Sequence, residues 1–285
     1  MHYSGLIPRG DTIVRWISPD GVMTEIHGPE AKTFIMGEGP EGMSSVEVEN
    51  LFEAAARQQG QTWVGHTMDH GEVDFPLHVL ANNSTELRYH MTWIESQFQR
   101  FRKGWLVSYS VATGWRWIAA RKSSMKSLVS RDPGRGAEVT YEVVLAVESP
   151  LAREADDTDE WVNKSRSGRG QLHLYPGPSE WESWPQFILR GPGTFRLRWA
   201  GNDVTFPKIN ADEWVLVNTD ETRPTLRARN DQGVERNLWP EMKPGQKIPY
   251  PIRGGQVTRI EVQVTGGNAQ SGTFVTTSVQ HEGLV

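Results

Sequence analysis

Two imidazoles and three carboxylates lie close together between Gly65 and Asp74, with His66 and His70 four residues apart. Histidine nitrogens and carboxylate oxygens are ligands in many zinc sites, so this segment is a candidate metal site. Two histidines at that spacing bind one ion when a helix brings them to one face. The glycines and the proline around them favour a loop that leads into a strand, and we therefore predict a polar loop and no metal site.

A second cluster of carboxylates is the acidic run at residues 156–160, which resembles part of a calcium-binding loop. It has neither the glycine that makes the sharp turn of such loops nor the bidentate glutamate that closes them. We therefore predict a solvated segment without a metal ion, and we expect the chain to need no cofactor.

Glu180 and Glu182 flank Trp181 and lie close to Trp184. Paired carboxylates across a cleft hydrolyse glycosidic bonds, and tryptophan rings offer apolar platforms to sugars. Two hypotheses follow: a glycoside hydrolase, and a carbohydrate-binding module that uses Trp181 and Trp184. The spacing does not set the distance between the acids, and the chain has no nucleophile elbow, zinc-protease motif or phosphate-binding loop. We expect no enzyme, and we keep the binding module as the alternative function.

The composition excludes several further classes. The absence of cysteine excludes disulfides, thiolate metal sites and a cysteine nucleophile. A net charge of −5 and scattered basic residues argue against a surface built to bind nucleic acid. No segment approaches the roughly 20 apolar residues of a membrane span and no secretory signal is visible, so we expect no membrane insertion. The 28 glycines, 17 prolines and 12 tryptophans favour short strands, tight turns and aromatic cores.

The first half is predicted to mix hairpins with one or two helices. Residues 12–17 and 22–27 form a hairpin, because the turn between them has proline and glycine where a bulged turn needs them. Apolar residues spaced by three and four predict a helix over 46–60 and a second helix over 83–104. A glycine ends each of these patterns.

Beyond Gly104 the apolar period changes to two, which is typical of strands. Residues 105–111 and 115–121 are predicted to form a hairpin, and residues 137–148 are the best strand of the chain. The segment 151–170 is first acidic, then basic and rich in glycine, so we predict a linker between domains at 1–150 and 171–285. Evenly spaced strands in the second half predict an antiparallel sandwich, at residues 194–199, 214–218, 225–229, 257–264 and 273–279.

Short motifs in the second half resemble a known family. Gly177–Glu180 makes a turn before Trp184–Pro192, in which a proline opens a strand and a glycine closes it. The order of the following segments, Ala211–Asn218, Leu238–Pro240 and Lys243–Gly245, is similar too. Together with the layout of the first half, these segments resemble the distal tail proteins of long-tailed bacteriophages, closest to the minor tail proteins of actinobacterial phages.

The resemblance implies a mainly-β fold with an N-terminal β-sandwich related to tail-tube proteins and a C-terminal galectin-like sandwich. It further implies a homo-oligomeric ring, usually six-fold, in the virion at the tail tip, made and assembled in the host cytoplasm. The ring would contact the tail tube protein above, the tail-associated hub protein below and other minor tail proteins. DNA would pass through the lumen without specific binding, which an acidic wall favours.

A ring protein needs surfaces that pair with its neighbours rather than aggregate. The hairpin at 12–27 and the loop at 28–43 are the segments that we expect to reach an adjacent subunit, and an ordinary hairpin within the domain is the alternative. The candidate contact residues are Ile13, Trp16, Val22, Ile26 and Phe34.

Overall fold

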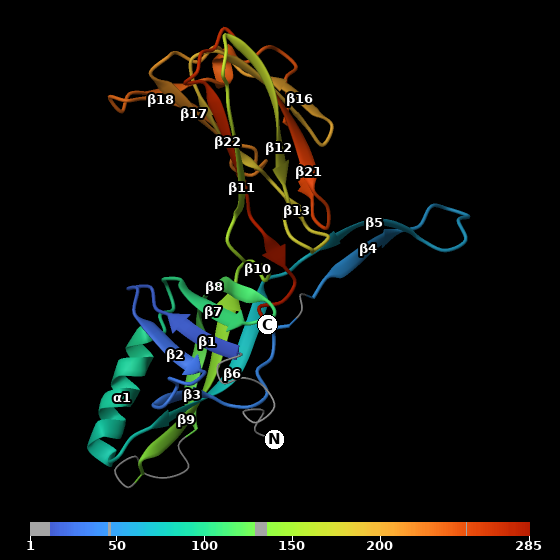
Figure 1. Cartoon of the computed structure of the whole chain (residues 1–285). Coiled ribbons are helices and arrows are strands. Elements are labelled where there is room, and N and C mark those ends of the chain that lie inside the picture. The colour runs from blue at the N-terminus through green and yellow to red at the C-terminus, as the bar shows by residue number, and fades with distance from the viewer. Residues whose placement is uncertain (1–11, 45–46, 129–135, 249) are drawn as a thin grey trace. The chain divides into compact units, whose positions relative to one another are not determined.

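The computed structural model describes residues 12–44, 47–128, 136–248 and 250–285 (Figure 1). The chain forms two compact units. Met1–Glu154 and the C-terminal His281–Val285 make the first unit, and Ala155–Gln280 make the second. The fold is mainly β, as the sequence predicts, and α1 is the α-helix among the described residues.

The first unit is built on a nine-stranded sheet, in which β2-β1-β7-β8-β9-β6-β3 are neighbours, β10 pairs with β8, and β23 pairs with β10. One helix, α1, packs on it. The elements are β1 (Thr12–Ile17), β2 (Met23–His27), β3 (Phe34–Met36), β6 (Gly71–Leu80), α1 (Ser84–Gln97), β7 (Gly104–Ser110), β8 (Gly114–Leu128), β9 (Glu138–Val147), β10 (Ala152–Arg153) and β23 (Gln280–His281).

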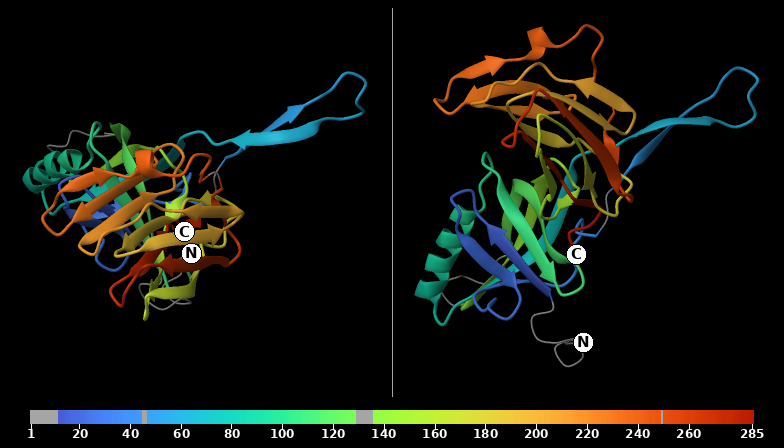
Figure 2. Two further views of the ribbon diagram at one scale, coloured as in Figure 1. Left: turned by 90° about the horizontal axis from the view of Figure 1, so that it is seen from above. Right: turned by 45° about the horizontal axis from the view of Figure 1, so that its top comes forward.

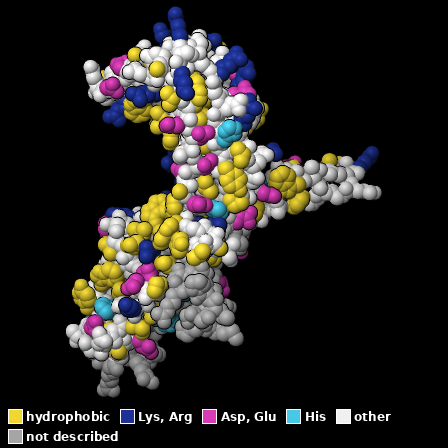
Figure 3. All heavy atoms as spheres, in the orientation of Figure 1, with side chains coloured by type: hydrophobic (Ala, Val, Ile, Leu, Met, Phe, Trp, Pro, Cys, Tyr) yellow, Lys and Arg dark blue, Asp and Glu magenta, His cyan; other side chains and the backbone are white. Residues whose placement is uncertain are grey.

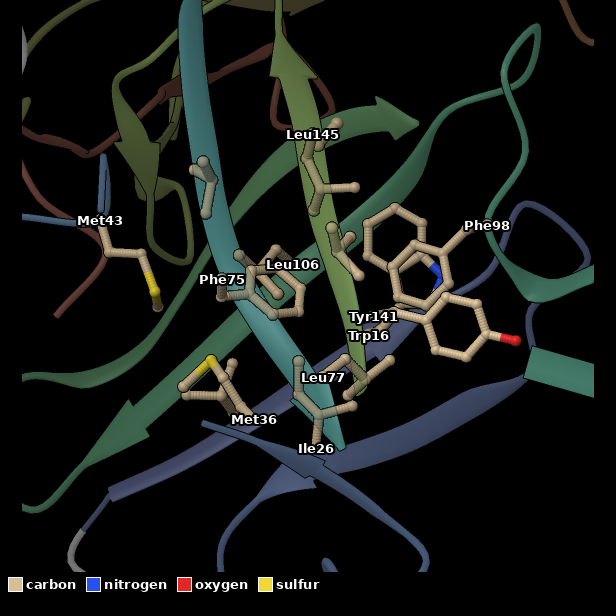
Figure 4. Packing of buried hydrophobic residues seen from close by; sticks show 14 of the residues in the cluster. Trp16, Ile26, Met36, Met43, Phe75, Leu77, Phe98, Leu106, Tyr141 and Leu145 are labelled. Atoms are coloured by element: carbon tan, nitrogen blue, oxygen red, sulfur yellow. The ribbon is translucent and has the colours of Figure 1, made fainter. Parts of the chain in front are cut away.

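Alternation explains the core of this unit, because every second side chain of a strand points to the same face. All five apolar residues that the sequence places on one face of β9, from Val139 to Val147, are buried. Trp16 and Phe98 stack with ring centroids 4.7 Å apart, and Figure 4 shows Tyr141 beside them. The C-terminal Leu284 belongs to the same core, since its side chain is buried and its N–H donates to the Met43 carbonyl at 2.7 Å.

The second unit is a sandwich of a six-stranded sheet, β11-β22-β14-β17-β18-β19, and a four-stranded sheet, β12-β21-β15-β16. Inward-facing residues of both sheets form one core, in which the ring centroids of Phe187 and Trp199 lie 5.1 Å apart. The elements are β11 (Asp157–Val162), β12 (Ser167–Leu174), β13 (Glu182–Ser183), β14 (Gln186–Arg190), β15 (Thr194–Trp199), β16 (Asn202–Thr205), β17 (Glu213–Asn218), β18 (Thr225–Asn230), β19 (Glu235–Asn237), the 3-10 helix η2 (Trp239–Glu241), β20 (Ile252–Arg253), β21 (Thr258–Thr265) and β22 (Gly272–Thr277).

The predicted helix over 46–60 is wrong. The segment contains β4 (Glu49–Glu53), which pairs with β5 (Thr62–Thr67) in a separate two-stranded sheet. A short apolar run fits one face of a helix or a strand equally well, and here the β-prone partner strand decides. Residues 45 and 46, at the predicted start of this helix, lie outside the described residues.

The second predicted helix is real but shorter. It ends at Gln97 instead of continuing to Gly104. Phe98 leaves the helix in an extended conformation and stacks on Trp16 in the core, so a tertiary contact ends the helix before the glycine does. Asn83 caps the start, because its side chain accepts from the Glu86 N–H at 2.9 Å.

Residues 151–170 are not an unstructured linker, because they contain β10, β11 and the start of β12. The acidic run forms β11, which pairs with β22. Asp157 accepts from the Tyr175 N–H at 2.7 Å, and Asp159 accepts from the His173 N–H at 2.8 Å. These carboxylates therefore bond the backbone just beside them, where the composition alone indicated solvated charges.

Candidate functional site

The five predicted contact residues fall into two groups. Trp16 and Ile26 are fully buried, because they occupy the inward positions of β1 and β2. They hold the core of the first unit and offer no surface to another subunit. Ile13 and Phe34 are half-buried and Val22 is exposed in the turn of the hairpin, so these three stay candidates for contact.

Phe34 is part of a hollow on this unit. Its ring stacks on Trp93 of α1, with centroids 5.0 Å apart. Both residues line a cavity of about 430 Å³ together with Met23, Glu25 and Lys32. The cavity contains both apolar and charged side chains, and nothing in it is arranged for a chemical step.

The candidate metal ligands between Gly65 and Asp74 are spread over two strands and the loop between them. His66 lies on β5, stacked on Trp63, while His70 lies in the turn before β6, so residues 65–74 run through two strands instead of one polar loop. Among the described residues there is no group of three or more histidine and acidic side chains that could hold a metal ion.

Trp181 and Trp184 lie on either side of the short strand β13 and are half-buried. Glu180 and Glu182 are exposed beside them. Neither tryptophan is among the residues that line the cavity beside Phe34 or the cavity over β12, β15 and β21. Sugar binding by Trp181 and Trp184 stays a prediction.

The residues that sequence reasoning missed lie on the outward face of β1, β7 and β8. Three rows of neighbours cross these strands: Ile13–Tyr109–Trp115, Arg15–Val107–Trp117 and Ile17–Trp105–Ala119. We call the seven apolar residues Ile13, Ile17, Trp105, Val107, Tyr109, Trp115 and Trp117 the aromatic face. Figure 3 shows hydrophobic side chains gathered over β7 and β8.

The aromatic face is ordered by its own contacts. The rings of Tyr109 and Trp115 lie 4.8 Å apart, and the guanidinium of Arg15 lies 5.2 Å from the centre of the Trp115 ring. Arg15 is itself held by Glu25 at 3.1 Å. Trp105 and Trp115 each remain 41% exposed. A contiguous, ordered apolar surface of this kind is typical of an interaction site.

The β4–β5 hairpin is a second apolar feature, which we call the arm (Figure 2). Phe52 and Trp63 are cross-strand partners, and each is more than half exposed. The indole N–H of Trp63 donates to the Asn50 side chain at 3.0 Å. A two-stranded hairpin alone is marginally stable in water, so the arm gains stability wherever another surface covers it.

No helix among the described residues is long and apolar enough to cross a membrane. The exposed apolar side chains described above make a pair of surfaces on the first unit, the aromatic face and the arm, the candidate functional site. The sequence contains a signal that could have identified the aromatic face. In residues 105–111 and 115–121 large apolar side chains also occupy the outward positions, where an ordinary half-buried strand has polar ones.

Comparison with known proteins gives the fold. No protein-family model and no curated protein matches the chain. The Dit protein of phage SPP1, described as a paradigm of the hub adsorption apparatus of phages that infect Gram-positive bacteria, is similar in structure with a TM-score of 0.61 and 12% identity, over 93% of this chain and 98% of that one. A chain of the phage P2 baseplate in its activated, calcium-containing conformation is similar with a TM-score of 0.50 and 9% identity, over 95% of this chain and 99% of that one.

The resemblance to distal tail proteins is thus confirmed at the level of the fold, and it covers nearly the whole of both chains. The actinobacterial origin stays a prediction.

Proposed function

We propose that the chain is a structural component of a bacteriophage tail tip, where copies of it form a closed ring, six-fold in symmetry, between the tail tube and the tail-associated hub. The fold that it shares with SPP1 Dit supports this proposal. The single observation that carries it is the aromatic face with the arm, because both leave large apolar side chains in water unless another subunit covers them.

A closed ring suits these two surfaces. In a ring each subunit uses one patch toward one neighbour and a different patch toward the other. The aromatic face and the arm are two such distinct patches on the first unit. We propose that the arm of one subunit lies on its neighbour and that the aromatic face, with Ile13 in it, is covered in the ring. Val22 and Phe34 contribute at the border of this face.

The remaining parts of the proposal follow from the place of the ring. The tail tube protein binds above it, the hub protein binds below it, and other minor tail proteins attach around it. DNA passes through the lumen without specific binding. The chain is made and assembled in the host cytoplasm and remains in the virion. The net negative charge of the chain belongs to the first unit, because residues 155–280 have equal numbers of acidic and basic side chains.

The test is the oligomeric state of the purified chain, measured by mass photometry and negative-stain imaging. We expect rings with a central hole at micromolar concentration. Trp105→Glu and Trp63→Glu should each give monomers, because a charge would be buried unpaired in the interface. Val234→Glu is the matched control, since this apolar side chain is also exposed but lies in the second unit. A wild-type chain that stays monomeric and binds neither tube nor hub protein would refute the proposal.

A further inference from the structure

The outward face of the four-stranded sheet in the second unit has a different character. Its side chains are all polar or charged, whereas the inward positions of the same strands are mostly apolar and buried. Strand pairing brings the side chains into rows. One row is Arg169–Gln263–Arg196, and the next is Gln171–Glu261–Arg198–Asp203. We call these residues, together with Arg259, the arginine face.

Ion pairs hold most of these arginines in place. Asp203 accepts from Arg196 through both oxygens, at 2.6 and 2.5 Å, and from Arg198 at 3.1 Å. The hydrogen bond from Arg196 holds the pKa of Asp203 below its usual range, so this carboxylate is charged at neutral pH. Glu261 lies 3.1 Å from Arg259. Paired in this way, the guanidinium groups stand at fixed positions on the sheet.

The pairing leaves an excess of positive charge. Three of the four arginines, Arg196, Arg198 and Arg259, share two carboxylates. The fourth, Arg169, has no ion pair or hydrogen bond with another described side chain. The second unit as a whole has equal numbers of acidic and basic side chains, so the excess is local to this face. Figure 3 shows lysine and arginine side chains drawn densely on the second unit.

The face is also hollowed. A cavity of about 420 Å³ opens over it, lined by the four arginines, Gln171, Gln263 and Glu261, with Gly170 and Val262 as the non-polar positions. Such a volume lies within the range of sites for small ligands. Arg169 and Arg196 stand on strands separated by β21, so they are about 10 Å apart at the backbone, with Gln263 between them.

We propose that the arginine face binds a hydroxylated anion, namely a saccharide unit that bears a phosphate or a carboxylate, as found along anionic glycopolymers. Planar guanidinium groups bind phosphate and carboxylate oxygens through two parallel hydrogen bonds. The glutamine amides and the paired carboxylates between them offer donors and acceptors to sugar hydroxyls. No aromatic side chain lines the cavity, which disfavours neutral sugars held by ring stacking and single-stranded nucleic acid held by base stacking.

Saturation-transfer NMR on the full chain tests the proposal with matched probes. Glucose 6-phosphate and glucuronate should both bind, and glucose should bind at least about tenfold more weakly, because it lacks the charged group. The stronger of the two acidic probes identifies the anionic group that the face prefers. Arg169→Gln should weaken the acidic probes by about tenfold. Arg190→Gln on β14 is the control, since this exposed strand arginine belongs to the other sheet.

Three results would overturn the proposal. Equal binding of glucose and glucose 6-phosphate would show that charge plays no part. Inorganic phosphate binding as tightly as glucose 6-phosphate would show a simple anion site without saccharide recognition. Polyglutamate that displaces both acidic probes and binds more tightly would indicate an acidic protein surface as the partner. Arg169 is exposed and belongs to the second unit, whereas the aromatic face belongs to the first. Arg169→Gln should therefore leave ring formation unchanged. Failure of the ligand proposal can in this way be distinguished from failure of the ring proposal.

Discussion

Trp16 and Trp105 lie on the same sheet but on opposite faces. Replacing each of them with alanine distinguishes a residue that stabilises the fold from one that contributes to assembly of the ring. Trp16 is fully buried, stacks on Phe98, and donates its indole N–H to the Gln97 carbonyl at 2.9 Å. Trp105 points outward and is 41% exposed. We expect Trp16→Ala to destabilise the first unit and Trp105→Ala to weaken the ring.

The magnitude for Trp16→Ala follows from its contacts. Truncating a buried tryptophan costs about 3–5 kcal/mol through lost burial and the cavity that remains. The unpaired carbonyl of Gln97 at the end of α1 adds about 1 kcal/mol. A total of about 4–6 kcal/mol is a large part of the roughly 5–15 kcal/mol that stabilises a domain. Trp16→Phe keeps the stacked ring and loses the donor, so it should cost about 1–2 kcal/mol.

Urea unfolding followed by circular dichroism measures these differences. With a slope of about 2 kcal/mol per molar urea, Trp16→Ala should lower the midpoint of the first unit by about 2–3 M. Trp105→Ala should shift it by less than about 0.5 M, since a half-exposed side chain loses little burial in the monomer. Mass photometry of the same samples should show weakened rings for Trp105→Ala.

The opposite pattern would refute this reasoning. If Trp16→Ala left the midpoint unchanged and abolished the ring, Trp16 would be an interface residue and the arrangement of β1 would be reversed. If Trp105→Ala lowered the midpoint as far as Trp16→Ala, the aromatic face would be a second core and could not carry the proposed contact.

Three further predictions concern other parts of the chain. Gly170→Ala places a Cβ 2.1 Å from the indole nitrogen of Trp161, so it should destabilise the second unit by about 1–3 kcal/mol in urea unfolding. Leu284→Ala truncates a buried side chain close to the C-terminus. It should lower the free energy of unfolding of the first unit by about 2–4 kcal/mol, which a thermal melt detects as a lower Tm. Burial and a hydrogen bond to Glu95 raise the pKa of Tyr141. Its contribution to stability is therefore complete below about pH 10 and is lost as the pH rises toward the folded-state pKa, so Tyr141→Phe should flatten the loss of stability at alkaline pH.

The strands could be predicted from the sequence wherever one face of the strand is buried and the other is exposed to solvent. β9 shows this directly, because every second residue from Val139 to Val147 is apolar and buried, and none of the residues between them is buried. The turn at Gly21 was predictable for a related reason, since its φ of +82° favours glycine. These elements depend on local spacing, and local spacing is what a sequence displays.

The failures occurred where a distant partner decides the structure. The run that became β4 has no alternation strong enough to exclude a helix, and only its pairing with β5 makes it a strand. The acidic strand β11 has charged side chains that accept hydrogen bonds from the backbone near β12, which composition could not reveal. In β1, alternation predicts two faces but does not say which of them is inside, so the sequence offers Ile13 and Trp16, on opposite faces, equally as contact candidates.

The same ambiguity bears on function, because it concerns the outward faces. In the first unit the outward face of β1, β7 and β8 is aromatic, and in the second unit the outward face of the four-stranded sheet is polar and rich in arginine. An aromatic face in water is unfavourable unless a second surface covers it, whereas an arginine face is well hydrated by itself and gains most from an anionic ligand. We therefore expect the two units to bind different partners: the first unit other copies of the chain, through apolar burial, and the second unit a charged, hydroxylated ligand. Salt should separate the two interactions, since screening weakens the second and leaves the first nearly unchanged.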